Sequence, residues 1–278
     1  MRVPVFCCGR FTFVLTRPLV MGILNVTPDS FSDGGRYVDR KRALAHARQM
    51  RADGADLIDI GGESSRPGAT PVAESEELDR VLPLVEALAG ENIALAVDTR
   101  KPAVMRAAAA AGAAMINDIG ALSAPGAIEA CAQSGVGVCL MHMQREPMTM
   151  QAAPVYADVV ADVRAFLVAR AEVCVAAGIA RERIAIDPGF GFGKTLAHNL
   201  ELLRSIGTFV ATGFPVVAGL SRKSSLGAIT GRSVDERMPA SLAAALAAVA
   251  RGVAIVRVHD VRETVDALRV WRAVESGI

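Results

Sequence analysis

Short apolar segments alternate with longer amphipathic segments along most of the chain. The apolar segments are rich in β-branched residues and are continuous rather than alternating, which predicts strands that are buried on both faces of a sheet. They cover residues 19–26, 57–63, 94–99, 115–121, 137–143, 184–190, 215–221 and 254–260. A segment rich in Ala, Leu and Arg follows each one, and several of these segments end in Gly, as helices commonly do.

Eight strand–helix units in a chain of 278 residues predict a (β/α)8 TIM barrel of the α/β class. The alternative is an open doubly wound sheet, which would need a glycine-rich nucleotide turn after an early strand, and the sequence has none there. No linker or change of composition divides the chain, so we expect residues 1–278 to form a single domain. Residues 1–18 form an N-terminal extension, in which "VFCCGRFTFVL" predicts a short strand pair that plugs one end of the barrel.

Composition and charge narrow the range of partners. A net charge of +1 and an aromatic content of 4% give no sign of a nucleic-acid surface. Arg10 interrupts the first apolar run and Arg251 a later one, so we expect neither a secretion signal nor a membrane span. The five cysteines have neither disulfide nor metal-site spacing, which is typical of a reducing cytosol and predicts a cytoplasmic protein.

One glycine-rich segment imitates a nucleotide-binding motif. The segment "DPGFGFGKT" resembles a phosphate loop, but that motif requires Gly at the position of Pro188. We therefore interpret it as a barrel loop and not as a nucleotide site.

Polar side chains gather where the predicted strands end. In a barrel these ends meet at one mouth, which is where active sites lie. Asp118 and Asp260 are explained at least as well as caps of the helices that follow them. The full set is Asn25, Glu63 to Arg66, Asp98, Asn117, Asp118, His142, Asp187, Ser221, Arg222, Lys223, Arg257, His259 and Asp260.

The last strand and the sixth suggest what the mouth binds. Arg257 and His259 alternate with Val256 and Val258, so both can face the barrel interior and bind an anionic group. The alternative is a cationic pair that neighbouring carboxylates neutralise. Asp187 could accept two parallel hydrogen bonds from a pterin or a guanine, and Lys223 is a separate point charge suited to a ring carbonyl or nitrogen.

Eight sequence blocks, in order, resemble the dihydropteroate synthase family. They are "MGILNVTPDSFSDGG", "GGESSRPGA", "VDTRKP", "INDIGAL", "LMHMQ" with "PMTMQ", "DPGFGFGKT", "GLSRKSSLG" and "RVHDV", and they span Met21 to Val261. The resemblance implies a TIM barrel that joins 7,8-dihydropterin-6-ylmethyl diphosphate to 4-aminobenzoate in folate synthesis. It also implies Mg²⁺ as cofactor, release of diphosphate, sensitivity of the family to sulfonamides, and a homodimer.

The resemblance also implies a role for individual residues. The pterin would contact Asp98, Asn117, Met141, Asp187, Gly219 and Lys223, and the diphosphate would contact Asn25, Arg257 and His259. The aminobenzoate would contact Phe31, Ser32, Ser65, Arg66, Pro67, Phe192 and Ser224. The metal would be held at Asn25 and Asp33, and Asp98, Lys223, Arg257 and His259 would act in catalysis.

We expect an SN1-like displacement, because a dihydropterin ring can share positive charge at the carbon that loses diphosphate. The loop over residues 28–36, with Phe31, Ser32 and Asp33, is expected to be a lid. Two alternatives stay open: a barrel that transfers a methyl group from tetrahydrofolate, and a catalytically silent pterin-binding paralogue.

Overall fold

Eight parallel strands form the sheet that the sequence predicts. The structure, a computed structural model, describes residues 4–26, 35–64, 68–146, 148–151 and 153–276. The strands lie in the order β8-β7-β6-β5-β4-β3-β10-β9, and an isolated parallel bridge between Ile186 and Val216 joins the two ends of this series. The predicted barrel is therefore confirmed. The strands are β3 (Leu19–Asn25), β4 (Leu57–Gly61), β5 (Ala94–Asp98), β6 (Met115–Asp118), β7 (Gly137–Met141), β8 (Ile184–Asp187), β9 (Val217–Ala218) and β10 (Ile255–Val258).

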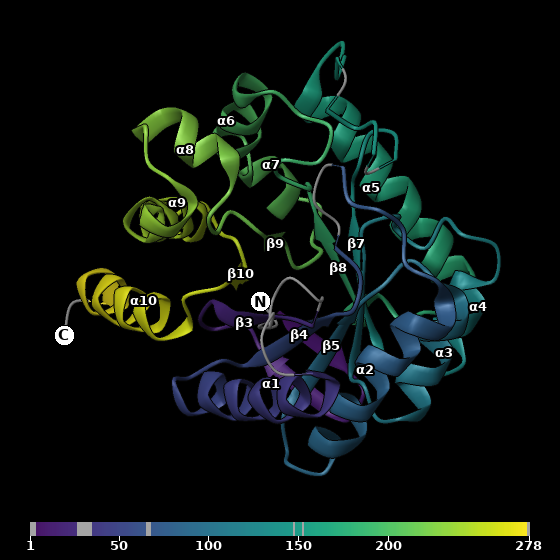
Figure 1. The fold of residues 1–278 in the computed structure, drawn as a ribbon. Coiled ribbons are helices and arrows are strands. Elements are labelled where there is room, and N and C mark those ends of the chain that lie inside the picture. The colour runs from purple at the N-terminus through teal and green to yellow at the C-terminus, as the bar shows by residue number, and fades with distance from the viewer. Residues whose placement is uncertain (1–3, 27–34, 65–67, 147, 152, 277–278) are drawn as a thin grey trace.

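Helices follow one another around the strands in chain order (Figure 1). The short helices α7 and α8, of four and seven residues, were not predicted. No helix within the described residues combines the length and the apolar character needed to cross a bilayer. The helices are α1 (Gly35–Ala52), α2 (Glu74–Ala89), α3 (Pro102–Ala110), α4 (Ala127–Ala132), α5 (Val159–Ala176), α6 (Leu196–Arg204), α7 (Gly207–Val210), α8 (Ser224–Thr230), α9 (Met238–Val249) and α10 (Val261–Ser276).

Local sequence sets where several helices begin. The Asp158 carboxylate accepts hydrogen bonds from the backbone N–H groups of Val160 and Ala161 at the start of α5. Thr195 and His198 form a reciprocal capping box at the start of α6. Pro102 occupies the first turn of α3, where a missing N–H costs nothing.

The strands end earlier than the apolar pattern suggested. β4 ends at Gly61 and β10 ends at Val258, so Glu63, His259 and Asp260 lie in the loops beyond them. The predicted range of β4 overran because Gly62 follows it directly, and a glycine does not distinguish a strand from an extended loop. The predicted range of β10 overran because it was extended over the polar residues that directly follow the apolar run.

An apolar layer fills the lower part of the barrel. Every barrel strand contributes to one buried cluster, and Phe6 and Cys8 of the N-terminal extension belong to it as well. These two residues lie in β1 (Val5–Cys8), which pairs antiparallel with β2 (Phe11–Val14), so the predicted strand pair is confirmed. The barrel residues of the cluster are Leu19, Met21, Leu57, Ala94, Ala96, Met115, Cys139, Ala185, Val217 and Ile255, with Ala114 just before β6.

Gly137 tests how tightly the strand pair closes the barrel. A Cβ at this position would lie 2.6 Å from Cys8 Cβ and 3.0 Å from the Cys7 carbonyl oxygen. We expect Gly137→Ala to lower the free energy of unfolding by about 1–3 kcal/mol, measured by urea denaturation, because the plug must shift. Gly90→Ala is the matched control, since nothing lies within 4 Å of its Cβ position, and it should unfold like the parent. Equal stability of both variants would contradict tight closure.

Candidate active site

The inside of the barrel is lined by apolar side chains at one level and mostly by polar side chains two residues further along the strands. Side chains two residues apart on a strand face the same side of the sheet. Six strands, and the residue directly after β9, therefore place a further residue above the member of the apolar cluster, toward the carboxyl ends of the strands. These residues are Asp59, Asp98, Asn117, Met141, Asp187, Gly219 and Arg257, which follow Leu57, Ala96, Met115, Cys139, Ala185, Val217 and Ile255.

Arg257 connects this polar layer across the barrel. Its Nε donates to Asp59 Oδ2 at 2.5 Å and its Nη2 donates to Asp98 Oδ2 at 3.0 Å. Asn117 Nδ2 donates to the same Asp59 oxygen at 2.9 Å. Of the two interpretations left open for Arg257, this geometry shows the pairing with neighbouring carboxylates and does not test the binding of an anion. Asp59, Asp98 and Asn117 are thereby joined to Arg257 in one hydrogen-bonded group.

Sequence reasoning missed Asp59. Its carboxylate is fully buried, and its Oδ1 has no hydrogen-bond partner among the described residues. A signal was available, because Asp59 is a charged residue in the middle of the apolar segment "LIDIG". It also stands two residues before Gly61, which pairs with both Asn25 and Asp98 in the neighbouring strands.

Burial controls the titration of the carboxylates. Desolvation raises the pKa of Asp98 to about 7, the Arg257 guanidinium acts against this rise, and the nearby carboxylates of Asp59, Asp118 and Glu77 add to it. Desolvation also raises the pKa of Asp187, opposed by the Gly189 backbone N–H and by the Lys223 charge. The site therefore holds carboxyl groups whose charge is costly without a cationic partner.

Asp187 and Lys223 lie beside other predicted residues. Asp187 Oδ1 accepts a hydrogen bond from the Gly189 N–H at 2.7 Å, and its Oδ2 lies 4.0 Å from where a Gly219 Cβ would stand. Lys223 Nζ lies 4.1 Å from the ring centroid of Phe192, a cation–π contact. The structure thus brings the predicted pterin residue Lys223 against the predicted aminobenzoate residue Phe192.

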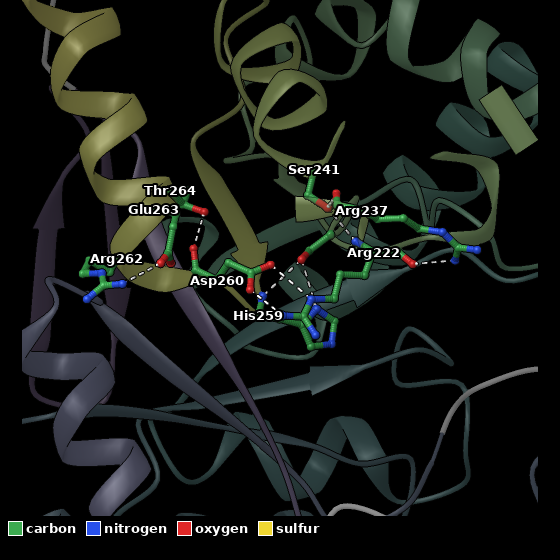
Figure 2. A network of polar contacts seen from close by, with 9 residues as sticks. Arg222, Arg237, Ser241, His259, Asp260, Arg262, Glu263 and Thr264 are labelled. Atoms are coloured by element: carbon green, nitrogen blue, oxygen red, sulfur yellow. Dashed lines mark hydrogen bonds and ion pairs between the residues drawn. The ribbon is translucent and has the colours of Figure 1, made fainter. Parts of the chain in front are cut away.

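The loops after β9 and β10 are joined by side chains (Figure 2). Ser221 Oγ accepts the His259 N–H at 3.2 Å and lies 3.0 Å from His259 Nδ1. The Asp260 carboxylate accepts two hydrogen bonds from Arg222 and so links the loop after β10 to the loop after β9. Asp118 instead accepts the backbone N–H groups of Gly120 and Leu122 in the turn after β6. Its role is structural, but it does not cap the next helix, because α4 begins at Ala127.

A buried lysine, also missed, holds the loop that imitates a phosphate-binding motif. Lys194 is 3% exposed, and its Nζ lies 3.0 Å from His142 Nδ1 and donates to the carbonyl oxygens of His142 and Phe192. Burial lowers the pKa of Lys194 to about 7 and that of His142 to about 3. His142, a candidate residue at the mouth, therefore anchors this loop. The sequence feature that could have pointed to Lys194 is its place in "DPGFGFGKT", the segment that resembles a phosphate loop.

Several predicted residues lie outside the described residues. These are Phe31, Ser32 and Asp33 of the expected lid, and Ser65, Arg66 and Pro67. Asn25 ends β3 beside Gly61, and Ser224 begins α8. Within the described parts of the chain, no group of three or more His, Cys, Asp or Glu side chains is arranged to hold a metal ion.

Comparison with known proteins places this arrangement in a family. Residues 21–259 match the family of pterin binding enzymes. The dihydropteroate synthase of Neisseria meningitidis serogroup B is 52% identical over 276 residues, which are 97% of each chain.

Two solved structures share the fold along almost their whole length. The dihydropteroate synthase of Xanthomonas albilineans with 4-aminobenzoic acid superposes with a TM-score of 0.93 at 52% identity, covering 99% of both chains. That of Burkholderia cenocepacia, complexed with 7,8-dihydropteroate, has a TM-score of 0.91 at 54% identity and covers 100% of this chain and 99% of its own. The matched residues contain the whole charged layer of the barrel, and the chain belongs to the pterin-binding enzymes and, within them, to the dihydropteroate synthases.

Proposed function

We propose that the charged layer is the pterin pocket in which this dihydropteroate synthase joins 7,8-dihydropterin-6-ylmethyl diphosphate to 4-aminobenzoate. The observation that carries the proposal is the buried group of Asp59, Asp98, Asn117 and Arg257, at the level where the barrel interior turns polar. Such a group suits a flat ligand rich in hydrogen-bond donors and acceptors, because every buried polar atom needs a partner.

A carboxylate, an amide and a lysine orient the pterin in this proposal. Asp187 accepts hydrogen bonds from the amidine-like edge of the ring, with its Oδ1 already held by the Gly189 N–H. Asn117 and Lys223 contact other ring heteroatoms, and Met141 and the Gly219 backbone line the ring. The closeness of Gly219 to Asp187 supports this, since a side chain at that position would stand in the pocket.

The diphosphate is assigned to Asn25, Arg257 and His259. Arg257 and His259 stand two residues apart at the end of β10, and His259 is held by Ser221. The side-chain oxygen of Asn25 suits Mg²⁺ of the kind that diphosphate brings with it, because such an ion keeps few protein ligands and takes most of its oxygens from phosphate and water. Asn25, and Asp33 outside the described residues, would hold the ion, which would neutralise charge on the departing diphosphate.

The aminobenzoate is assigned to the space beside Phe192 and Ser224. The Phe192 ring and the Lys223 side chain form one wall, supported by their contact at 4.1 Å. Phe31, Ser32, Ser65, Arg66 and Pro67 are proposed to complete it from the two loops outside the described residues. An arylamine is neutral near pH 7, so this wall needs no general base.

The reaction is proposed to run with bond breaking ahead of bond making. Asp98 lies against the pterin pocket and would stabilise positive charge that develops on the ring as diphosphate leaves. Its effect is strong because the site is desolvated, and Arg257 holds its carboxylate in place at 3.0 Å. Arg257 and His259 stabilise the opposite charge on the leaving group.

A homodimer remains a prediction. The Ala-rich helix α9 buries Ala244, Ala245 and Ala248 within the chain's own core. Leu196, Leu200 and Ile229 are exposed apolar residues on α6 and α8 and are better placed to meet a second copy. The mass in solution, from light scattering, decides between monomer and dimer.

Diphosphate release should require both substrates. Purified enzyme with Mg²⁺ is expected to release diphosphate only when the pterin diphosphate and 4-aminobenzoate are both present, with stoichiometric dihydropteroate. Methyl transfer from tetrahydrofolate to a corrinoid, without condensation, would identify the methyltransferase alternative. Pterin binding without any turnover would identify the silent paralogue.

Asp98→Asn should impair the chemical step. We expect kcat to fall on the order of 100-fold, because the variant loses the charge that stabilises the ring cation. The raised pKa of Asp98, about 7, leaves the carboxyl protonated in acid. In the parent enzyme, kcat/KM for the pterin diphosphate should therefore rise with pH through about 7 and level off above it. An unchanged acid limb in Asp98→Asn would refute this role.

Asp187→Ala should weaken pterin binding more than catalysis. Loss of charge-assisted hydrogen bonds is expected to raise the Kd of the pterin substrate about 100-fold, measured by calorimetry. Asp187→Asn is the matched control for loop structure, because its carbonyl oxygen can still accept the Gly189 N–H. Near-normal pterin affinity in both variants would exclude Asp187 from the pocket.

A further inference from the structure

The seam between β9 and β10 has little backbone pairing near the mouth. β9 contains only Val217 and Ala218, which pair with Ile255 and Val256 of β10. Beyond these pairs, no further ladder pair joins the two described segments, which continue to Lys223 and Ser224 on one side and to Arg257 and His259 on the other. Direct links between the two segments at the mouth are therefore made by side chains.

Arg222 supplies one such link. Its Nε donates to Asp260 Oδ2 at 3.1 Å and its Nη2 donates to Asp260 Oδ1 at 2.5 Å, which is a two-pronged ion pair across the seam (Figure 2). The two side chains are 34% and 15% exposed, so the pair is partly withdrawn from solvent. A planar guanidinium on a carboxylate fixes direction as well as distance.

The backbone of Arg222 is also held in an unusual conformation. Its φ of 57° lies in the left-handed region, which residues other than glycine seldom adopt. The Arg222 N–H donates to Ser241 Oγ at 2.9 Å, and the Arg222 carbonyl accepts from Arg237 Nη1 at 3.2 Å. Ser241 belongs to α9 and Arg237 directly precedes it, so the helix braces the loop from outside.

The sequence neighbours of the Arg222–Asp260 pair are residues proposed to bind two different groups, the aminobenzoate and the diphosphate. Arg222 directly precedes Lys223, which is the N-cap of α8, and Ser224 begins that helix. Asp260 directly follows His259. We propose that the Arg222–Asp260 pair is a positioning clamp that holds the aminobenzoate side and the diphosphate side of the site in one fixed relation. The inference rests on the proposed assignment of these two sides.

The clamp predicts an effect on the ligand of the opposite loop. Arg222→Met should weaken inhibition by pyrophosphate, although Arg222 lies on the aminobenzoate side. Asp260→Asn should raise KM for 4-aminobenzoate, although Asp260 lies on the diphosphate side. We expect each change to be at least about fivefold, and the double variant to be no worse than either single variant. Arg222→Lys, which keeps a cation and one donor, should recover part of both losses and also serves if Arg222→Met does not fold.

Three controls separate the outcomes. Arg262→Met removes an ion pair with Glu263 that lies close to Asp260 in the sequence, and the Arg262 side chain is 70% exposed. This variant should change neither the KM for 4-aminobenzoate nor the inhibition constant of pyrophosphate. Ser224→Ala should raise KM for aminobenzoate and His259→Ala should weaken pyrophosphate inhibition; failure of either overturns the assignment of sides. If both behave as assigned, but each clamp variant affects only the ligand of its own loop or the losses add in the double variant, the clamp is overturned.

Discussion

Pairing of buried charge at the centre of the barrel is the constraint on which the rest of the site depends. Asp59 and Asp98 lie where water has been largely removed, and an unpaired carboxylate there would cost several kcal/mol, on the order expected for a buried ion. Arg257 of β10 meets both of them across the barrel interior. The three strands β4, β5 and β10 must therefore keep their register for the charges to remain paired. The same requirement that stabilises the site also fixes its geometry.

Most of the fold and much of this central layer could be predicted from the sequence. Continuous apolar strands and the helices between them specify a closed parallel sheet, and Asp98, Asn117, Asp187 and Arg257 stand where their strands approach the mouth. Asp59 escaped prediction because it is embedded in apolar residues and followed by more of them. A count of two residues from the interior residue Leu57 would have found it, since the same step separates Ala96 from Asp98.

Lys194 and the Arg222–Asp260 pair could not be predicted in the same way. Periodicity tells which face of a strand a residue occupies, but it says nothing about contacts between loops that are distant in the sequence. Lys194 meets His142 across 52 positions, and Arg222 meets Asp260 across 38. Burial of the Lys194 ammonium without a carboxylate contact is also contrary to the usual rule for charged residues. Only the folded arrangement supplies the carbonyl oxygens that make it tolerable.

The two loop anchors solve a problem that a barrel of short strands creates. A strand of two residues such as β9 cannot by its backbone hold loops in place several residues further on. A longer strand could hold the loops by backbone pairing, but its side chains and its hydrogen-bonded backbone would then extend into the space that the substrates must enter. Anchoring each loop through a side chain avoids this conflict: Lys194 links the Phe192 segment to the end of β7, and Arg222 links the Lys223 segment to the end of β10. These anchors use Lys194, Arg222 and Asp260, none of which is assigned to a substrate, and they leave the assigned residues of the same loops to bind the ligands.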